Sequence, residues 1–282
     1  MKKVTVIGAG AMGSQIAMAT ALGGYNVTLY DIEQIKLDQA EHDLRGLLER
    51  KVQKNKMEQA VMDQAFAKLT CSHNFEKALQ ESDLVIEAIV ENLEIKQELF
   101  AKLDQEAPAH TILASNSSTI VSSKLAHVTN RPDKVCNIHF FNPALVMELV
   151  EVVKNSETSD ETVEKAMEYA RTIGKSPILL EKEIFGFVTN RILNAVFDEA
   201  MYLYENGIAS IEEIDLACTK GLNYPIGPFK LMDLTGVDVN YHIRQIKYEE
   251  TKNEQDLPQT CLVEKYEAGE LGKKTGKGFY QY

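Results

Sequence analysis

Through the first 180 residues, short β-branched and apolar runs alternate with longer stretches of helical character. The pattern predicts strands over residues 3–7, 26–30, 84–88, 111–114, 135–139, 150–153 and 178–180. It predicts helices over residues 13–22, 33–69, 93–105 and 159–172, the last closed by Gly174. Such alternation is typical of βαβ units on a parallel sheet.

The pattern changes near residues 181–186. From residue 187 to 206 the apolar residues recur at helical spacing, and Gly207 follows where a helix commonly ends. Ser210 and Glu213 are spaced as a capping box for a further helix. Because no pair of strands is apparent after residue 180, we predict an α/β domain over residues 1–184, with a helical insertion, and an all-α domain over residues 185–282.

Composition and charge narrow the function classes. The 282 residues include 42 acidic and 30 basic side chains, a formal charge of −12, which disfavours nucleic acid as the main partner. Residues 4–30 carry no charge, but glycines and polar residues interrupt them too often for a signal peptide or membrane span. We therefore predict a cytosolic protein with no membrane association. The four cysteines lie far apart, without the close pairs typical of zinc sites, so we also predict no metal site.

A glycine motif indicates the first ligand. The run Gly8-Ala9-Gly10-Ala11-Met12-Gly13 follows a predicted strand and opens a helix, as in Rossmann-type dinucleotide sites. Asp31 ends the next strand, where an acid accepts the ribose hydroxyls and repels a 2′-phosphate. The sequence therefore favours NAD over NADP, and FAD remains an alternative because it uses the same half-motif.

His139 and Glu151 form a candidate acid–base pair. A turn at Asn142-Pro143 and a returning strand over 150–153 would bring the carboxylate back to the imidazole. A neutral histidine can take a hydroxyl proton while the carboxylate fixes its tautomer, which alcohol oxidation requires. Spacing alone fits a structural histidine beside an ion-paired glutamate equally well.

Several motifs together resemble a known family. They are residues 6–17, Val85-Ile86-Glu87-Ala88-Ile89-Val90-Glu91-Asn92, Ser115-Asn116-Ser117-Ser118, His139-Phe140-Phe141-Asn142-Pro143, Gly186-Phe187-Val188-Thr189-Asn190-Arg191 and Gly276-Lys277-Gly278-Phe279-Tyr280. In order and extent they resemble the short-chain L-3-hydroxyacyl-CoA dehydrogenases over nearly the whole chain. The resemblance implies a Rossmann domain, a helical dimerisation domain that forms a homodimer, and reversible NAD-linked oxidation of (S)-3-hydroxyacyl-CoA, with 3-hydroxybutyryl-CoA as the expected substrate.

The resemblance also assigns roles to individual residues. It makes His139 the acid–base group, Glu151 its partner, Ser118 a hydrogen-bonding partner of the substrate oxygen, and Asn190 a ligand of the acyl group. Glu91, Lys96, Asn116, Ser118 and Asn142 match positions that contact the cofactor, beside the glycine loop and Asp31. An ordinary solvated lysine remains an alternative for Lys96, as does a polar helix-surface position for Asn190.

Arg50, Lys51, Lys54 and Lys56 form a cationic cluster in this acidic chain. Lys51 and Lys54 are our candidates for binding the phosphates of an acyl-CoA, and a solvated helix face is the alternative. Two other functions stay open at this point: a different NAD(P)-linked hydroxy-acid dehydrogenase, and a non-catalytic NAD-binding protein on the same scaffold. The sequence leaves acyl-chain length, reaction direction and pathway (butyrate formation or fatty-acid degradation) undecided.

Overall fold

The computed structural model covers residues 1–282, which form two compact units, Met1–Phe187 and Val188–Tyr282. The division follows Phe187, three residues after the boundary that the change of sequence pattern predicts (187 − 184 = 3). None of the helices combines the length and apolar character that a membrane crossing requires.

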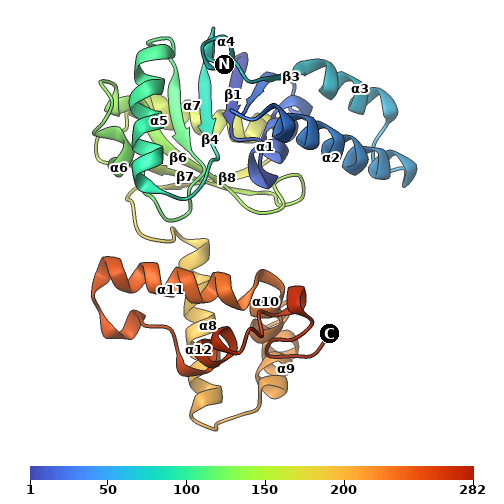
Figure 1. Ribbon diagram of the computed structural model, residues 1–282, viewed down its shortest axis with the longest axis vertical. Helices are drawn as coiled ribbons and strands as arrows, with labels where there is room; N and C mark the ends of the chain where they lie inside the picture. The colour runs from blue at the N-terminus through green and yellow to red at the C-terminus, as the bar shows by residue number, and fades with distance from the viewer. The chain divides into compact units, whose positions relative to one another are not determined.

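The first unit is built on one eight-stranded sheet with the spatial order β3-β2-β1-β4-β5-β6-β7-β8 (Figure 1). Neighbouring strands pair in parallel except β6 and β7, which are antiparallel. The strands are β1 (Lys3–Ile7), β2 (Asn26–Tyr30), β3 (Leu69–Ser72), β4 (Leu84–Glu87), β5 (Ile112–Ser115), β6 (Val135–Phe140), β7 (Leu149–Lys154) and β8 (Ser176–Leu180). This mostly parallel sheet confirms the predicted fold class.

Helices cover both faces of the sheet (Figure 1). Side chains alternate along each strand, so Val4 and Val6 of β1 join one core and Ile7 joins the other. The first core includes helices α1 (Ala11–Leu22), α2 (Gln34–Gln53), α3 (Gln59–Lys68) and α7 (Asp160–Thr172). The second includes α4 (Phe75–Leu79), α5 (Leu93–Glu106) and α6 (Ser123–Ala126), and the turn η1 (Pro132–Lys134) precedes β6.

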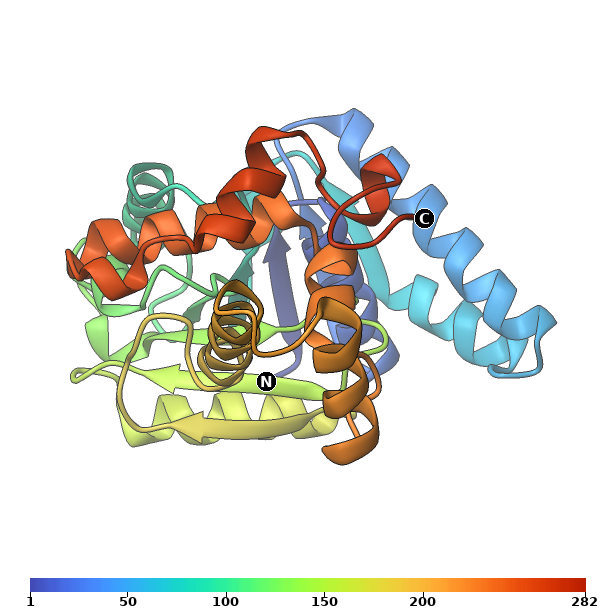
Figure 2. The same cartoon turned by 90° about the horizontal axis from the view of Figure 1, so that it is seen from below.

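Residues 33–69 differ most from the sequence prediction. The helical stretch expected there is divided into two helices, α2 and α3, that extend away from the sheet edge (Figures 1 and 2). Asn55 lies between them with a φ of 53°, a left-handed conformation that does not continue a helix. Strand β3, which the prediction missed, is a half-exposed edge strand without the continuous apolar run that marks a buried strand.

The second unit is helical, as predicted, and its strand-like pairing is limited to isolated bridges near its end. Its elements are α8 (Thr189–Glu205), α9 (Ile211–Gly221), α10 (Pro228–Thr235), α11 (Val237–Thr251), η2 (Glu254–Asp256), α12 (Thr260–Glu267) and η3 (Lys273–Thr275). The predicted capping box forms, because Ser210 and Glu213 exchange side-chain and backbone bonds at the start of α9.

The last residues of the chain dock onto a buried carboxylate. Asp233 accepts hydrogen bonds from the N–H groups of Phe279 and Tyr280, each at 2.8 Å, and from the hydroxyl of Tyr282 at 3.1 Å. A Cβ at Gly278 would lie 2.1 Å from the Asp233 Oδ1 atom, so only glycine lets the backbone approach. The motif at residues 276–280 therefore has a structural role within the second unit.

Candidate active site

The glycine loop lies between β1 and α1, at the point where the strand order reverses. Gly8 has a φ of 102°, and a Cβ there would come within 2.6 Å of the carbonyl oxygen of Ala88. A Cβ at Gly13 would lie 1.8 Å from the carbonyl oxygen of Gly8, so this glycine permits the helix to start against the loop. The tight turn at the carboxyl ends of β1 and β4 is where doubly wound sheets bind ligands.

Asp31 lies beside the same loop, immediately after β2. Its Oδ2 atom accepts a hydrogen bond from the N–H of Ala9 at 2.8 Å, and its Oδ1 atom accepts one from Glu33 at 3.1 Å. The carboxylate is thus fixed next to the glycine loop, as a partner for ribose hydroxyls must be.

The loop fits a dinucleotide. Gly10 caps α1 without a side-chain hydrogen bond, so the first N–H groups of the helix have no capping side chain. No atom lies within 4 Å of a Cβ built on Gly10, whereas Ala11 is exposed and Met12 is half-buried against the core. A helix N-terminus with open space before it is a suitable site for a pyrophosphate.

His139 and Glu151 are directly opposite each other on β6 and β7. The Nδ1 atom of His139 lies 2.9 Å from the Oε2 atom of Glu151, and both side chains are buried. The rings of Phe141 and Phe187 pack beside the imidazole, with centroids 4.6 and 5.5 Å away. The pair predicted from a turn and a returning strand is therefore present, and Nε2 is the ring nitrogen left for a ligand.

A charged cluster lies at the carboxyl end of β4. Lys96, at 1% exposure, is buried instead of solvated, and its Nζ atom lies 2.5 Å from Glu87 and 3.3 Å from Glu91. Burial raises the pKa of Glu91, but the charge of Lys96 and hydrogen bonds from Ser117 and Thr119 outweigh it and hold that pKa below its usual range. Glu87 is a residue that the sequence analysis did not assign.

The serine-rich loop, residues 115–119, begins at the end of β5, beside this cluster. Asn116 accepts a hydrogen bond from the N–H of Phe140 through its Oδ1 atom at 2.9 Å, which links the loop to the end of β6. Asn137, on β6 two residues before His139, donates to the carbonyl oxygens of Ser117 and Ile120. Its own Oδ1 atom is buried without a partner. Ser118 is half-buried on this loop.

The cationic cluster lies at the end of α2, where Lys51 is half-buried and Lys54 is exposed. Burial and the nearby charge of Lys51 lower the pKa of Lys175, against an opposing effect of Glu148. Lys175 also donates to the carbonyl oxygens of Ala144 and Met147, each at 2.7 Å. Lys51 is therefore near a second lysine that the sequence analysis missed.

The remaining predicted residues are Asn142 and Asn190. Asn142 is exposed at the start of the turn after β6. Asn190 is half-buried near the start of α8, in the second unit. Glu87, Asn137 and Lys175 are the residues that sequence reasoning missed. The signal for the first two is a polar side chain within a fully buried strand.

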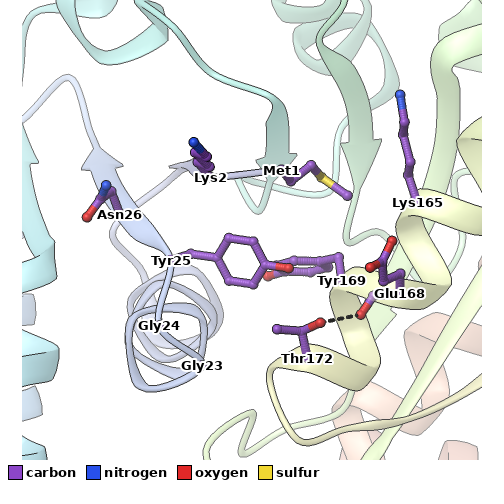
Figure 3. Close-up of a pocket in the computed structure, with 10 residues that line it drawn as sticks. All are labelled: Met1, Lys2, Gly23, Gly24, Tyr25, Asn26, Lys165, Glu168, Tyr169 and Thr172. Carbon is purple, nitrogen blue, oxygen red and sulfur yellow. Dashed lines mark hydrogen bonds between the residues drawn. The ribbon is translucent and has the colours of Figure 1, made fainter.

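A separate cavity is present elsewhere in the first unit. It has a volume of about 480 Å³ and is lined by residues from the start of the chain, residues 23–26 and α7 (Figure 3). Tyr25 and Tyr169 lie beside each other in it, with ring centroids 5.5 Å apart. None of the predicted site residues lines this cavity, which is at the amino ends of β1 and β2.

Comparison with known proteins covers both units. Residues 3–184 match a family model described as "3-hydroxyacyl-CoA dehydrogenase, NAD binding domain", and residues 186–282 match "3-hydroxyacyl-CoA dehydrogenase, C-terminal domain". The chain is 40% identical to the mitochondrial hydroxyacyl-coenzyme A dehydrogenase of Sus scrofa, covering 100% of this chain and 91% of the relative. It is 39% identical to a 3-hydroxybutyryl-CoA dehydrogenase of Clostridioides difficile, covering 99% of each. The crystal structure of (S)-3-hydroxybutyryl-CoA dehydrogenase PaaH1 from Ralstonia eutropha superposes with a TM-score of 0.95 at 37% identity, covering 100% of this chain and 99% of that one.

Proposed function

We propose, on the premise that this chain belongs to the 3-hydroxyacyl-CoA dehydrogenase family, that it oxidises short-chain (S)-3-hydroxyacyl-CoA reversibly, with 3-hydroxybutyryl-CoA as the principal substrate. The chain is an NAD-dependent dehydrogenase, which removes the non-catalytic alternative and the FAD alternative. The observation that carries the proposed reaction is the buried His139–Glu151 pair on β6 and β7, where the neighbouring strand β5 ends in the serine-rich loop.

His139 acts as the acid–base group in this proposal. Because its Nδ1–H donates to the Glu151 carboxylate, the Nε2 lone pair faces the substrate and takes the proton of the C3 hydroxyl. Glu151 holds the ring orientation and stabilises the imidazolium that forms. In the reverse direction the imidazolium returns that proton to the C3 oxygen.

The cofactor residues follow from the loop geometry. Gly8, Gly10, Ala11, Met12 and Gly13 would hold the pyrophosphate, and Asp31 the ribose hydroxyls, while Glu91, Lys96, Asn116, Ser118 and Asn142 would lie on the nicotinamide side. NAD, when bound, supplies the acceptor for the hydride that leaves C3.

Ser118 and Asn190 are the residues that we propose to bind the substrate. A hydroxyl both donates and accepts, so Ser118 suits an oxygen that alternates between alcohol and ketone. The amide of Asn190 would hold the acyl group and support its developing carbonyl. These two roles come from the family resemblance.

For the CoA phosphates we propose Lys51 and Lys54. The support for Lys51 is its position near Lys175, and both lysines belong to a cationic cluster in a chain whose formal charge is −12. An anion there would relieve the mutual repulsion of the lysines.

We also propose a homodimer formed through the second unit. Large apolar side chains on its helices are exposed, among them Ile192, Leu216, Leu222 and Leu234. Light scattering would give twice the chain mass, and a monomer at working concentration would contradict the dimer. The cytosol is the proposed compartment, supported by four cysteines that are all free thiols.

A spectrophotometric assay tests the proposed reaction. With acetoacetyl-CoA and NADH, we expect NADH absorbance to fall far faster than with free acetoacetate or with NADPH. A series of longer 3-oxoacyl-CoA esters then measures the preference for short chains. Equal rates with free acetoacetate would identify a hydroxy-acid dehydrogenase that does not need CoA, and would refute the proposed substrate.

A further inference from the structure

We propose that Glu87 is a positioning residue for the cofactor site: its buried carboxylate holds Lys96 and the serine-rich loop (residues 115–119) in their working arrangement. The inference rests on the proposed function, because that function places Lys96 at the cofactor and Ser118 at the substrate. Glu87 itself acts through these groups.

The carboxylate of Glu87 contacts three separate segments. Its Oε1 atom accepts from Lys96 of α5 at 2.5 Å and from the N–H of Ile89 at 2.7 Å, and its Oε2 atom accepts from the hydroxyl of Ser115 at 2.7 Å. The side chain has no exposure to solvent. A buried charge needs such a set of partners, because each lost partner leaves desolvation uncompensated.

Glu87 also orients the more exposed acid of the cluster through Lys96. The Lys96 ammonium is shared between Glu87, at 0% side-chain exposure, and Glu91, at 39%. Glu91 accepts further hydrogen bonds from the hydroxyls of Ser117 and Thr119. The solvent-facing carboxylate therefore depends on a lysine whose position is fixed from the buried side by Glu87.

Two consecutive residues of the serine-rich loop are attached to Glu87. The N–H of Asn116 donates to its backbone carbonyl at 2.8 Å, and Ser115 donates to its carboxylate. The Ser115 hydroxyl also accepts from the N–H of Ser117 at 3.1 Å, which passes the constraint along the loop toward Ser118. Asn137 holds the other side of the loop, so its position is set from β4 and from β6.

Packing alone does not require a charge at this position. The other residues of β4 are Leu84, Val85 and Ile86, all buried, and apolar replacements of buried ion pairs often leave stability unchanged. The charge lies instead at the carboxyl end of β4. Strand β4 pairs with β1, and the glycine loop follows the end of β1. Its position matches a role in the site.

The test measures NADH binding in the absence of substrate, with the increase in NADH fluorescence as the readout. In Glu87→Gln the amide keeps the shape but cannot accept from all three donors, so we expect the dissociation constant to rise about tenfold or more. The matched control is Asp104→Asn. Asp104 is in the same helix as Lys96, and the substitution weakens its buried contact with Arg131. At a temperature well below both melting points, the control should change NADH affinity less than about twofold.

Ser115→Ala separates positioning from a general loss of stability. It removes only the hydroxyl relay, and we expect NADH affinity to fall about threefold or more. The double variant Glu87→Gln/Ser115→Ala should bind NADH with the same affinity as Glu87→Gln, within about twofold. If Glu87→Gln does not fold, Ser115→Ala alone tests the relay. Wild-type affinity in Glu87→Gln or in Ser115→Ala, or full additivity in the double variant, overturns the proposal.

The two proposals fail separately. If the wild-type chain does not reduce acetoacetyl-CoA but Glu87→Gln still weakens NADH binding, the proposed substrate is wrong and the positioning role stands. If the wild type reduces acetoacetyl-CoA and Glu87→Gln binds NADH normally, the positioning role is wrong and the proposed function stands.

Discussion

His139 offers one ring nitrogen to a ligand, because its Nδ1 atom is engaged by Glu151 at 2.9 Å. Replacing the imidazole removes both the proton acceptor and the group that aligns the C3 oxygen. We expect His139→Ala to lower kcat about a thousandfold while NADH affinity stays close to that of the wild type. Steady-state kinetics with acetoacetyl-CoA measure the first quantity and NADH fluorescence the second. Full activity in this variant would refute the proposed mechanism.

A second prediction at the residue scale concerns Asp233, which receives three hydrogen bonds from the last four residues of the chain. In Asp233→Asn an NH2 group replaces one carboxylate oxygen, so a donor faces another donor. We expect a loss of about 1–3 kcal/mol in unfolding free energy, measured by urea denaturation. Asp238→Asn is the control, because its partner Lys274 is half exposed and such pairs contribute about 1 kcal/mol or less. Equal losses in the two variants would contradict the docking role of Asp233.

At the scale of elements, the end of α2 carries the proposed CoA contacts. We expect Lys51→Ala/Lys54→Ala to raise KM for the CoA ester and to leave kcat nearly unchanged, because both lysines bind far from the reacting carbon. Lys36→Ala, at the start of the same helix and paired with Glu33, is the matched control and should change neither constant. An unchanged KM in the double variant would remove α2 from the substrate site.

The elements also show what the sequence can predict. Strands β1 and β2, the Rossmann loop and the β6–β7 pair follow from local patterns, because each depends on residues close together in the chain. Strand β3 was missed because an edge strand needs no continuous apolar run. The cluster of Glu87, Lys96 and Ser115 was missed because hydrophobic periodicity does not show which polar side chains converge when strands β4 and β5 become neighbours.

At the scale of the whole molecule, several carboxylates make the free energy of unfolding depend on pH. Burial raises the pKa values of Asp83, Glu91 and Asp104, but hydrogen bonds and nearby positive charges outweigh it, so all three pKa values lie below their usual range. The folded chain then binds fewer protons than the unfolded chain as pH falls. The contribution is complete above the ordinary values of 3.8 for Asp and 4.5 for Glu, and is lost as pH falls through the lower folded values.

We therefore expect the melting temperature to be nearly constant from about pH 7 to about pH 5 and to fall steeply below about pH 4.5. Calorimetry across this range measures the effect. Asp104→Asn starts from a lower melting temperature and should lose less of it on acidification, because one of the shifted groups no longer titrates. A melting temperature that does not change with pH would contradict this account.

The antiparallel pairing of β6 and β7 has a consequence for how the chain tolerates change. His139 and Glu151 are cross-strand neighbours, so their contact depends on the ladder and not on the conformation of residues 141–148 that join the strands. Loop length is therefore free to vary as long as the strands keep their alignment, whereas a slip of one residue would turn the carboxylate to the opposite face of the sheet. Residues 141–148 can therefore change in length and sequence while the contact between His139 and Glu151 is kept.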